Sequence, residues 1–89
     1  MGRVMASIRI FPSDPSCDLS GLRSEIINRL PKDVSVLGFR EDPIAFGLVA
    51  LIVNLTMPEN VDGMMDGVEG VLRSIEGVSE IQVLALTRT

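Results

Sequence analysis

Few side chains in this 89-residue sequence could perform acid–base or nucleophilic chemistry. Histidine, the usual general base at neutral pH and the commonest zinc ligand, is absent. The single cysteine, Cys17, excludes an internal disulfide. A reactive thiol there would have no histidine to activate it, and a small packed residue is the alternative. Ser–His and Cys–His catalysis is therefore excluded, and no cofactor is expected.

Acidic side chains gather in two places. Asp62, Asp66 and Glu69 lie in the segment DGMMDGVEG. Their spacing does not place ligands at alternate residues, as a calcium loop requires, and the segment has helical periodicity. Glu41 and Asp42 are adjacent, so on an extended chain they point apart and indicate a solvated edge. With no glycine-rich phosphate loop either, the sequence predicts neither a metal site nor a nucleotide site of its own.

Charge and hydropathy narrow the classes of partner. The net charge is −4, the eight basic residues are scattered, and tryptophan and tyrosine are absent. Direct nucleic-acid binding needs clustered Lys and Arg and is not expected. No window approaches the ~18 apolar residues of a membrane span, and the N-terminus lacks the features of a signal peptide. We therefore expect a cytoplasmic protein without membrane contact.

Hydrophobic periodicity predicts six elements in one domain, residues 1–89. The expected segments are a strand Arg3–Phe11, a helix capped by Asp18 and running to about Arg29, a strand Val34–Arg40 with a bulge at Gly38, a connection Glu41–Phe46, a strand Gly47–Thr56, a helix from Val61 between an Asn60 cap and a Gly77 cap, and a strand Val78–Leu86. The order βαββαβ indicates an α+β, ferredoxin-like sandwich with two helices on one face of a four-stranded antiparallel sheet. Right-handed crossovers place the first and third strands in the centre.

The third strand is apolar on both faces. The positions expected to face the helices are Val49, Leu51, Val53 and Leu55. Those expected on the uncovered face are Leu48, Ala50 and Ile52. Such a row on an open face indicates contact with another protein or a second subunit, although scattered exposed aliphatic residues are also normal.

The second helix carries a flank of small residues. Gly63, Gly67, Gly70 and Ser74 fall on one side of a helical wheel, beside the apolar stripe. This flank indicates close approach to the first helix or a flat surface for a partner. The alternative is a marginal helix that tolerates its glycines.

Phe46 stands between Ala45 and Gly47, just before the third strand. Pro43 restrains Asp42 to an extended conformation, and Gly47 permits an unusual backbone angle. The ring could project from the end of the sheet or cap the end of the core. The residues alone favour the cap.

Two segments carry a resemblance to a known family. The βαββαβ order, PIAFGLVAL (residues 43–51) and SIEGVSEI (residues 74–81) resemble archaeal translation elongation factor 1-beta, a stand-alone form of the exchange domain of the eukaryotic factor. The resemblance implies a guanine-nucleotide exchange factor, not an enzyme. It would bind the GTPase elongation factor 1-alpha and promote release of GDP. We expect the protein to be a monomer.

The resemblance also implies two partner contacts. The aromatic residue of the family's F-G motif packs into the GTPase; Phe46 occupies that position with Gly47 beside it, after Pro43, Ile44 and Ala45. A C-terminal lysine of the eukaryotic domain reaches the magnesium and phosphate region. No lysine stands there in this sequence, and Arg88 is the nearest candidate.

A second function is compatible with the same fold. The apolar open face and the glycine flank would also suit a regulatory module that binds a small molecule, resembling amino-acid-sensing domains.

Overall fold

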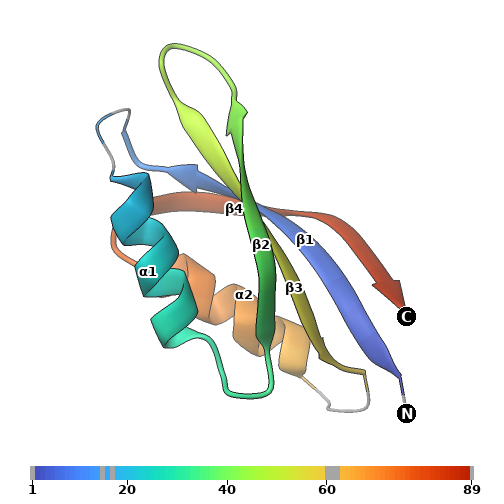
Figure 1. Cartoon of the computed structure of the whole chain (residues 1–89). Coiled ribbons are helices and arrows are strands. Elements are labelled where there is room, and N and C mark those ends of the chain that lie inside the picture. The colour runs from blue at the N-terminus through green and yellow to red at the C-terminus, as the bar shows by residue number, and fades with distance from the viewer. Residues whose placement is uncertain (1, 15, 17, 60–62, 89) are drawn as a thin grey trace.

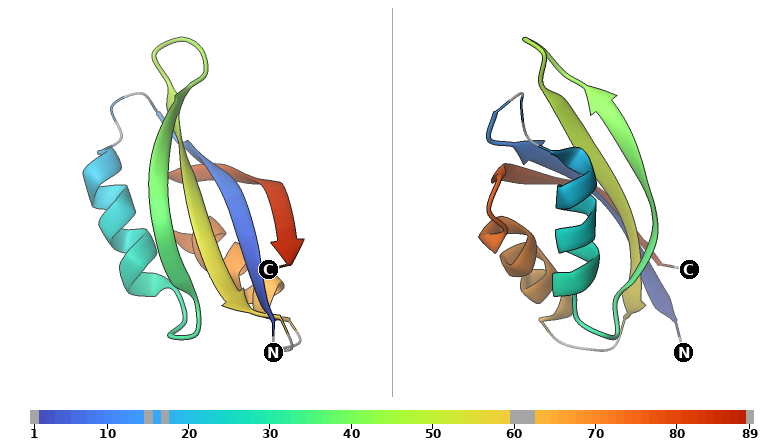
Figure 2. Two further views of the ribbon diagram at one scale, coloured as in Figure 1. Left: turned by 45° about the vertical axis from the view of Figure 1, so that its right-hand side comes forward. Right: turned by 60° about the vertical axis from the view of Figure 1, so that its left-hand side comes forward.

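A computed structural model describes residues 2–14, 16, 18–59 and 63–88. The expectations for Cys17, Asn60, Val61 and Asp62 lie outside these residues. The elements are β1 (Arg3–Pro12), α1 (Leu19–Arg29), β2 (Ser35–Pro43), β3 (Val49–Pro58), α2 (Met64–Ser74) and β4 (Val78–Arg88). They form an antiparallel sheet of order β2-β3-β1-β4 (Figure 1). Both helices lie on one face of it (Figure 2), so the predicted ferredoxin-like sandwich is confirmed.

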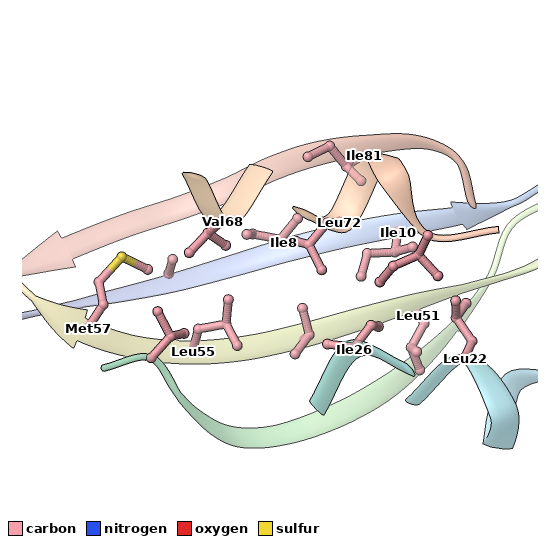
Figure 3. Packing of buried hydrophobic residues seen from close by; sticks show 14 residues of the cluster. Ile8, Ile10, Leu22, Ile26, Leu51, Leu55, Met57, Val68, Leu72 and Ile81 are labelled. Atoms are coloured by element: carbon pink, nitrogen blue, oxygen red, sulfur yellow. The ribbon is translucent and has the colours of Figure 1, made fainter. Parts of the chain in front are cut away.

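The core lies between the central strands and the helices. Alternate residues of β1 point toward the helices, and Ala6, Ile8 and Ile10 are fully buried. Leu51 and Leu55 of β3 face the same space, where Ile26 of α1 and Leu72 of α2 meet them (Figure 3). Burial of these branched aliphatic side chains supplies the main favourable free energy of folding.

Helix α1 begins and ends where its sequence predicts. The Asp18 carboxylate accepts a hydrogen bond from the Ser20 N–H at 3.1 Å, which satisfies one of the unpaired donors of the first turn. Leu22 and Ile26 are buried on the inner stripe. The chain leaves the helix at Leu30, next to Pro31, which cannot continue it.

Helix α2 differs from the prediction at both ends. Gly63 has φ +75° and precedes the helix, so its assignment to the helix interior is wrong. The helix ends at Ser74 with Ile75 as its cap. Gly77, predicted as the cap, lies in the following turn with φ +97°, where glycine avoids the steric cost of a side chain. No helix among the described residues is long and apolar enough to cross a membrane.

The strand bounds differ from the prediction: β2 ends at Pro43 instead of Arg40, β3 runs from Val49 to Pro58 instead of from Gly47 to Thr56, and β4 continues past Leu86. The expected bulge at Gly38 is confirmed by a register shift between Val36 and Gly38. However, Glu41, Asp42 and Pro43 continue β2 instead of forming a connection, because each pairs with β3. Gly47 lies in a turn before β3, and β4 extends two residues past Leu86 to Arg88.

The uncovered sheet face is not the exposed apolar row that the sequence indicated. Ala50 is fully buried, and Ile52 is 3% exposed, although neither belongs to the core on the helix side. Arg9 lies opposite Ile52 and Asp42 lies opposite Ala50 in the register. Side chains of the same chain therefore cover the apolar middle of this face, and it does not require a second protein.

The glycine flank of α2 is not in close contact with α1. A Cβ built at Gly67 or Gly70 would meet nothing within 4 Å, apart from the helix's own backbone and chain neighbours. Both residues are exposed. Close helix packing is thus excluded as the reason for these glycines.

The open space around this flank predicts a gain in stability. We expect Gly67→Ala with Gly70→Ala to raise the free energy of unfolding by about 1–2 kcal/mol, since each Gly in a helix interior costs about 0.5–1 kcal/mol relative to Ala. Urea unfolding followed by circular dichroism measures it. Gly63→Ala is the matched control and should lower stability, because φ +75° strains any residue with a Cβ.

Candidate functional site

The predicted partner-binding residues Pro43 to Gly47 lie on an arm that extends beyond the four-stranded sheet. The last β1–β3 pair is Ile10 with Leu51, whereas β2 and β3 continue to pair as far as Pro43 with Val49. Residues 42–50 are therefore a two-stranded ribbon. Figures 1 and 2 show this ribbon projecting past the other elements.

A tight turn closes the arm. The Leu48 N–H donates to the Ala45 carbonyl at 2.9 Å, and the Ile44 N–H donates to the Leu48 carbonyl at 3.0 Å. The two central residues have positive φ, +54° for Phe46 and +80° for Gly47, as a type I′ turn requires. Asn-Gly is the preferred pair in this turn, because a bulky residue at positive φ is strained.

Phe46 has 96% of its surface exposed at the tip of this arm. The interpretation of Phe46 as a cap on the core is wrong. Ile44, 41% exposed, adds apolar surface nearby, while Pro43, Ala45 and Gly47 are also exposed. The five residues thus form one projecting apolar tip, which can insert into a hydrophobic pocket but carries no group for acid–base chemistry.

Arg88 lies at the other end of the sheet. It pairs with Val4 at the beginning of β1, next to the end of β3. Its Nε is 3.3 Å from Glu59 Oε2, and its side chain is 84% exposed. The guanidinium is therefore accessible, with one carboxylate to pair with.

The structure does not bring Phe46 and Arg88 together. The ten residues of β3 separate the two ends of the sheet, and at ~3.3 Å per residue they span roughly 30 Å. The longest dimension of the molecule is 43 Å. A partner that touched both residues would have to follow most of that length.

Sequence reasoning missed the ion pairs at the base of the arm. Asp42 and Glu41 were interpreted as a solvated edge, but each has a cationic partner: Asp42 pairs with Arg9 at 3.1 Å and Glu41 with Arg23 at 3.0 Å. Continuing β2 through Pro43 would have placed Glu41 on the face that the helices cover and Asp42 on the uncovered face, where Arg9 also lies. Among the residues that the structure describes, no group of histidine, cysteine or carboxylate side chains could hold a metal ion.

Comparison with known proteins decides the family. Residues 5–89 match the model of the EF-1 guanine nucleotide exchange domain. The chain is 39% identical over 88 residues to elongation factor 1-beta of Saccharolobus islandicus, covering 99% of this chain and 97% of that protein. The chain belongs to the EF-1 guanine nucleotide exchange family. Its function is guanine-nucleotide exchange in translation elongation, as the resemblance implied.

Solved structures similar to this exchange domain support the fold alone. The C-terminal domain of MgtC from Mycobacterium tuberculosis superimposes with a TM-score of 0.67 at 16% identity, covering 97% of this chain and 87% of that one. The ACT domain of GTP pyrophosphokinase from Chlorobium tepidum gives 0.61 at 18% identity, covering 90% and 96%. These likenesses confirm the βαββαβ sandwich and leave the ligand-binding alternative without a further supporting observation.

The strained turn of the exchange domain predicts a gain in stability when Phe46 is replaced. We expect Phe46→Asn to raise the free energy of unfolding by about 1 kcal/mol, because Asn tolerates the positive φ that strains Phe. Denaturant unfolding measures the change. Phe46→Val is the control and should not be stabilising, since a β-branched residue fits positive φ poorly. Equal stability of wild type and Phe46→Asn would contradict strain at this position.

Proposed function

We propose that this protein binds the GTPase elongation factor 1-alpha, inserts Phe46 into a pocket of it, and so promotes exchange of GDP for GTP. The observation that carries the proposal is the exposure of Phe46 at the tip of a projecting arm, in a conformation that disfavours its side chain. A large aromatic residue gains most of its binding energy when a partner buries it. Neither the turn nor contact with water favours Phe at this position.

Exchange requires no catalytic acid or base in this protein. A factor that binds the nucleotide-free GTPase more tightly weakens nucleotide binding by the same coupling free energy. A hundredfold weakening needs about 2.7 kcal/mol of differential binding, which one buried aromatic anchor can supply. The protein accordingly acts on the nucleotide site of its partner instead of catalysing a chemical step of its own.

The remaining features of the proposal follow from the same role. The whole chain, residues 1–89, acts as one exchange domain in the cytoplasm, where translation takes place. Pro43, Ile44, Ala45 and Gly47 accompany Phe46 in the contact. Arg88 makes a second contact, with its guanidinium directed at the magnesium and phosphate region. Its exposure supports that role, whereas its distance from Phe46 requires a partner surface that follows the long dimension of the sheet.

Removing the Phe46 ring tests the anchor. We expect Phe46→Ala to slow the release of a fluorescent GDP analogue from elongation factor 1-alpha by about 30-fold or more at a fixed, subsaturating concentration, as for loss of an interface hot spot worth ~2 kcal/mol or more. Stopped-flow fluorescence measures the release. Ile27→Ala is the matched control, since Ile27 is 54% exposed on α1, away from the arm, and its loss should leave release unchanged.

The outcomes separate the activity from the assignment of the site. If the wild-type protein does not accelerate release, the proposed function is wrong. If Phe46→Ala accelerates release as well as the wild type, the function stands and the anchor lies elsewhere.

Arg88 is tested by charge removal and charge retention. We expect Arg88→Ala to reduce stimulated release by about 3-fold to 10-fold, since an accessible charge contributes on the order of 1 kcal/mol at a partner's surface. Arg88→Lys should retain most of the activity. The control is Arg73→Ala, which removes an exposed cation from α2. An undiminished rate for Arg88→Ala would show that the C-terminal contact of the eukaryotic domain has no equivalent here.

A further inference from the structure

The arm that carries Phe46 is anchored at its base from both faces of the sheet. Glu41 and Asp42 are consecutive residues of β2, and they lie opposite Leu51 and Ala50 of β3. Leu51 is also the last β3 residue that pairs with β1. The two carboxylates therefore stand where the four-stranded sheet becomes a two-stranded ribbon, and their side chains leave on opposite faces.

On the uncovered face, Asp42 is held from the far side of β3. Arg9 belongs to β1, and β3 lies between β1 and β2. Arg9 Nε is 3.1 Å from Asp42 Oδ2, and Arg9 Nη1 donates to Gln82 Oε1 of β4 at 2.9 Å. One guanidinium thus links the edge strand β2 with the opposite edge strand β4.

The ion pair lies on the face of β3 that carries Ala50 and Ile52. Ala50 lies opposite Asp42 and is fully buried, and Arg9 lies opposite Ile52, one step further along the same face of β3. The apolar row of β3 is therefore the surface over which this ion pair is formed.

On the helix face, Glu41 is held by α1. Arg23 Nη2 is 3.0 Å from Glu41 Oε2, and the Arg23 guanidinium carbon lies 5.6 Å from the centre of the Phe39 ring. Phe39 precedes Glu41 by two residues on β2 and packs partly buried against the core. Arg23 is thereby fixed by a cation–π contact and directs its charge at the base of the arm.

We propose that Arg9 with Asp42 and Arg23 with Glu41 form a two-sided clamp that sets the direction in which the arm presents Phe46. A two-stranded ribbon is only marginally stable alone, so its orientation depends on contacts at its base. The side chains of Arg9 and Asp42 are 28% and 33% exposed, and those of Arg23 and Glu41 are 37% and 54% exposed. Ion pairs in contact with solvent contribute little to global stability, so we assign to these pairs control of the direction of the arm. Asp42, Glu41, Arg9 and Arg23 are thus positioning residues for the exchange contact, and this part of the proposal rests on the function proposed above.

The clamp is tested first in the free protein, without the GTPase. We expect Asp42→Asn with Glu41→Gln to lower the backbone order parameters of residues 44–48 from ¹⁵N relaxation toward about 0.6. The residual dipolar couplings of the same amides should change relative to those of β1 and β3. Glu25→Gln is the matched control: it removes an exposed ion pair of α1, with Arg29, and should leave the arm unchanged.

Exchange is then measured with the same variants. We expect the double variant to stimulate release about 10-fold less than the wild type, because a misdirected anchor loses its productive geometry, with little change in the thermal unfolding midpoint. Arg9→Asp alone and Asp42→Arg alone should each reduce stimulation. The double variant Arg9→Asp with Asp42→Arg restores an ion pair with the two charges exchanged, and it should recover most of the stimulation of release.

Each result supports or overturns the clamp. Unchanged order parameters and couplings in the double variant would overturn it, whatever the exchange rate. If exchange is reduced while the order parameters and couplings of the arm are unchanged, and the charge-reversed pair does not recover activity, the carboxylates contact the GTPase directly and the clamp is wrong. If the wild type does not stimulate exchange, the proposed function fails, and the measurements on the free protein still decide whether the clamp exists.

Discussion

The pairing of β3 with β1 is the constraint on which the other elements of this domain depend. β3 is apolar on both faces, with Leu51, Val53 and Leu55 in the core and Ala50 and Ile52 beneath the uncovered face. A strand of this kind must occupy the middle of a sheet, where neighbours on both sides satisfy its backbone. The edge positions are then occupied by β2 and β4. The two helices cover the face of the sheet that carries the core residues.

Burial on the uncovered face is achieved without a second apolar layer. Long polar side chains can cover aliphatic surface with their stems while their charged ends remain near water. Arg9 does so between Asp42 and Gln82, and Ser7 donates to Asn54 on the same face at 2.5 Å. A hydrogen bond of this kind contributes about 0.5–1.5 kcal/mol net, and an ion pair in contact with solvent contributes about 0–1 kcal/mol. They do restrict how the strands lie relative to one another, which matters most where β2 and β3 leave the sheet.

Most of the fold could be predicted from the sequence, because it depends on periodicity. Hydrophobic periodicity identified the six elements and the inward-facing side of the third strand, and the crossover rule placed the first and third strands in the centre of the sheet. The cross-strand pairs could not be predicted, since Arg9 and Asp42 meet only after the register of three strands is fixed. The functional site, likewise, could be predicted only in part. The resemblance identified Phe46, but periodicity cannot distinguish a Phe that caps a core from one that projects at positive φ.

The local conformation of Phe46 disfavours a phenylalanine at this position. Asn fits the positive φ of this turn better than Phe does, and a polar side chain would be better hydrated at this exposed position. Both local terms therefore oppose Phe at this position, and the proposed burial of the ring by a partner would supply a third term that favours it. The strain also has a structural consequence: a turn with two positive φ values closes the ribbon in very few residues. With the proposed clamp, the backbone geometry of the turn and the ion pairs at the base would together set the direction of the arm, so that little of that direction would be left to be fixed on binding.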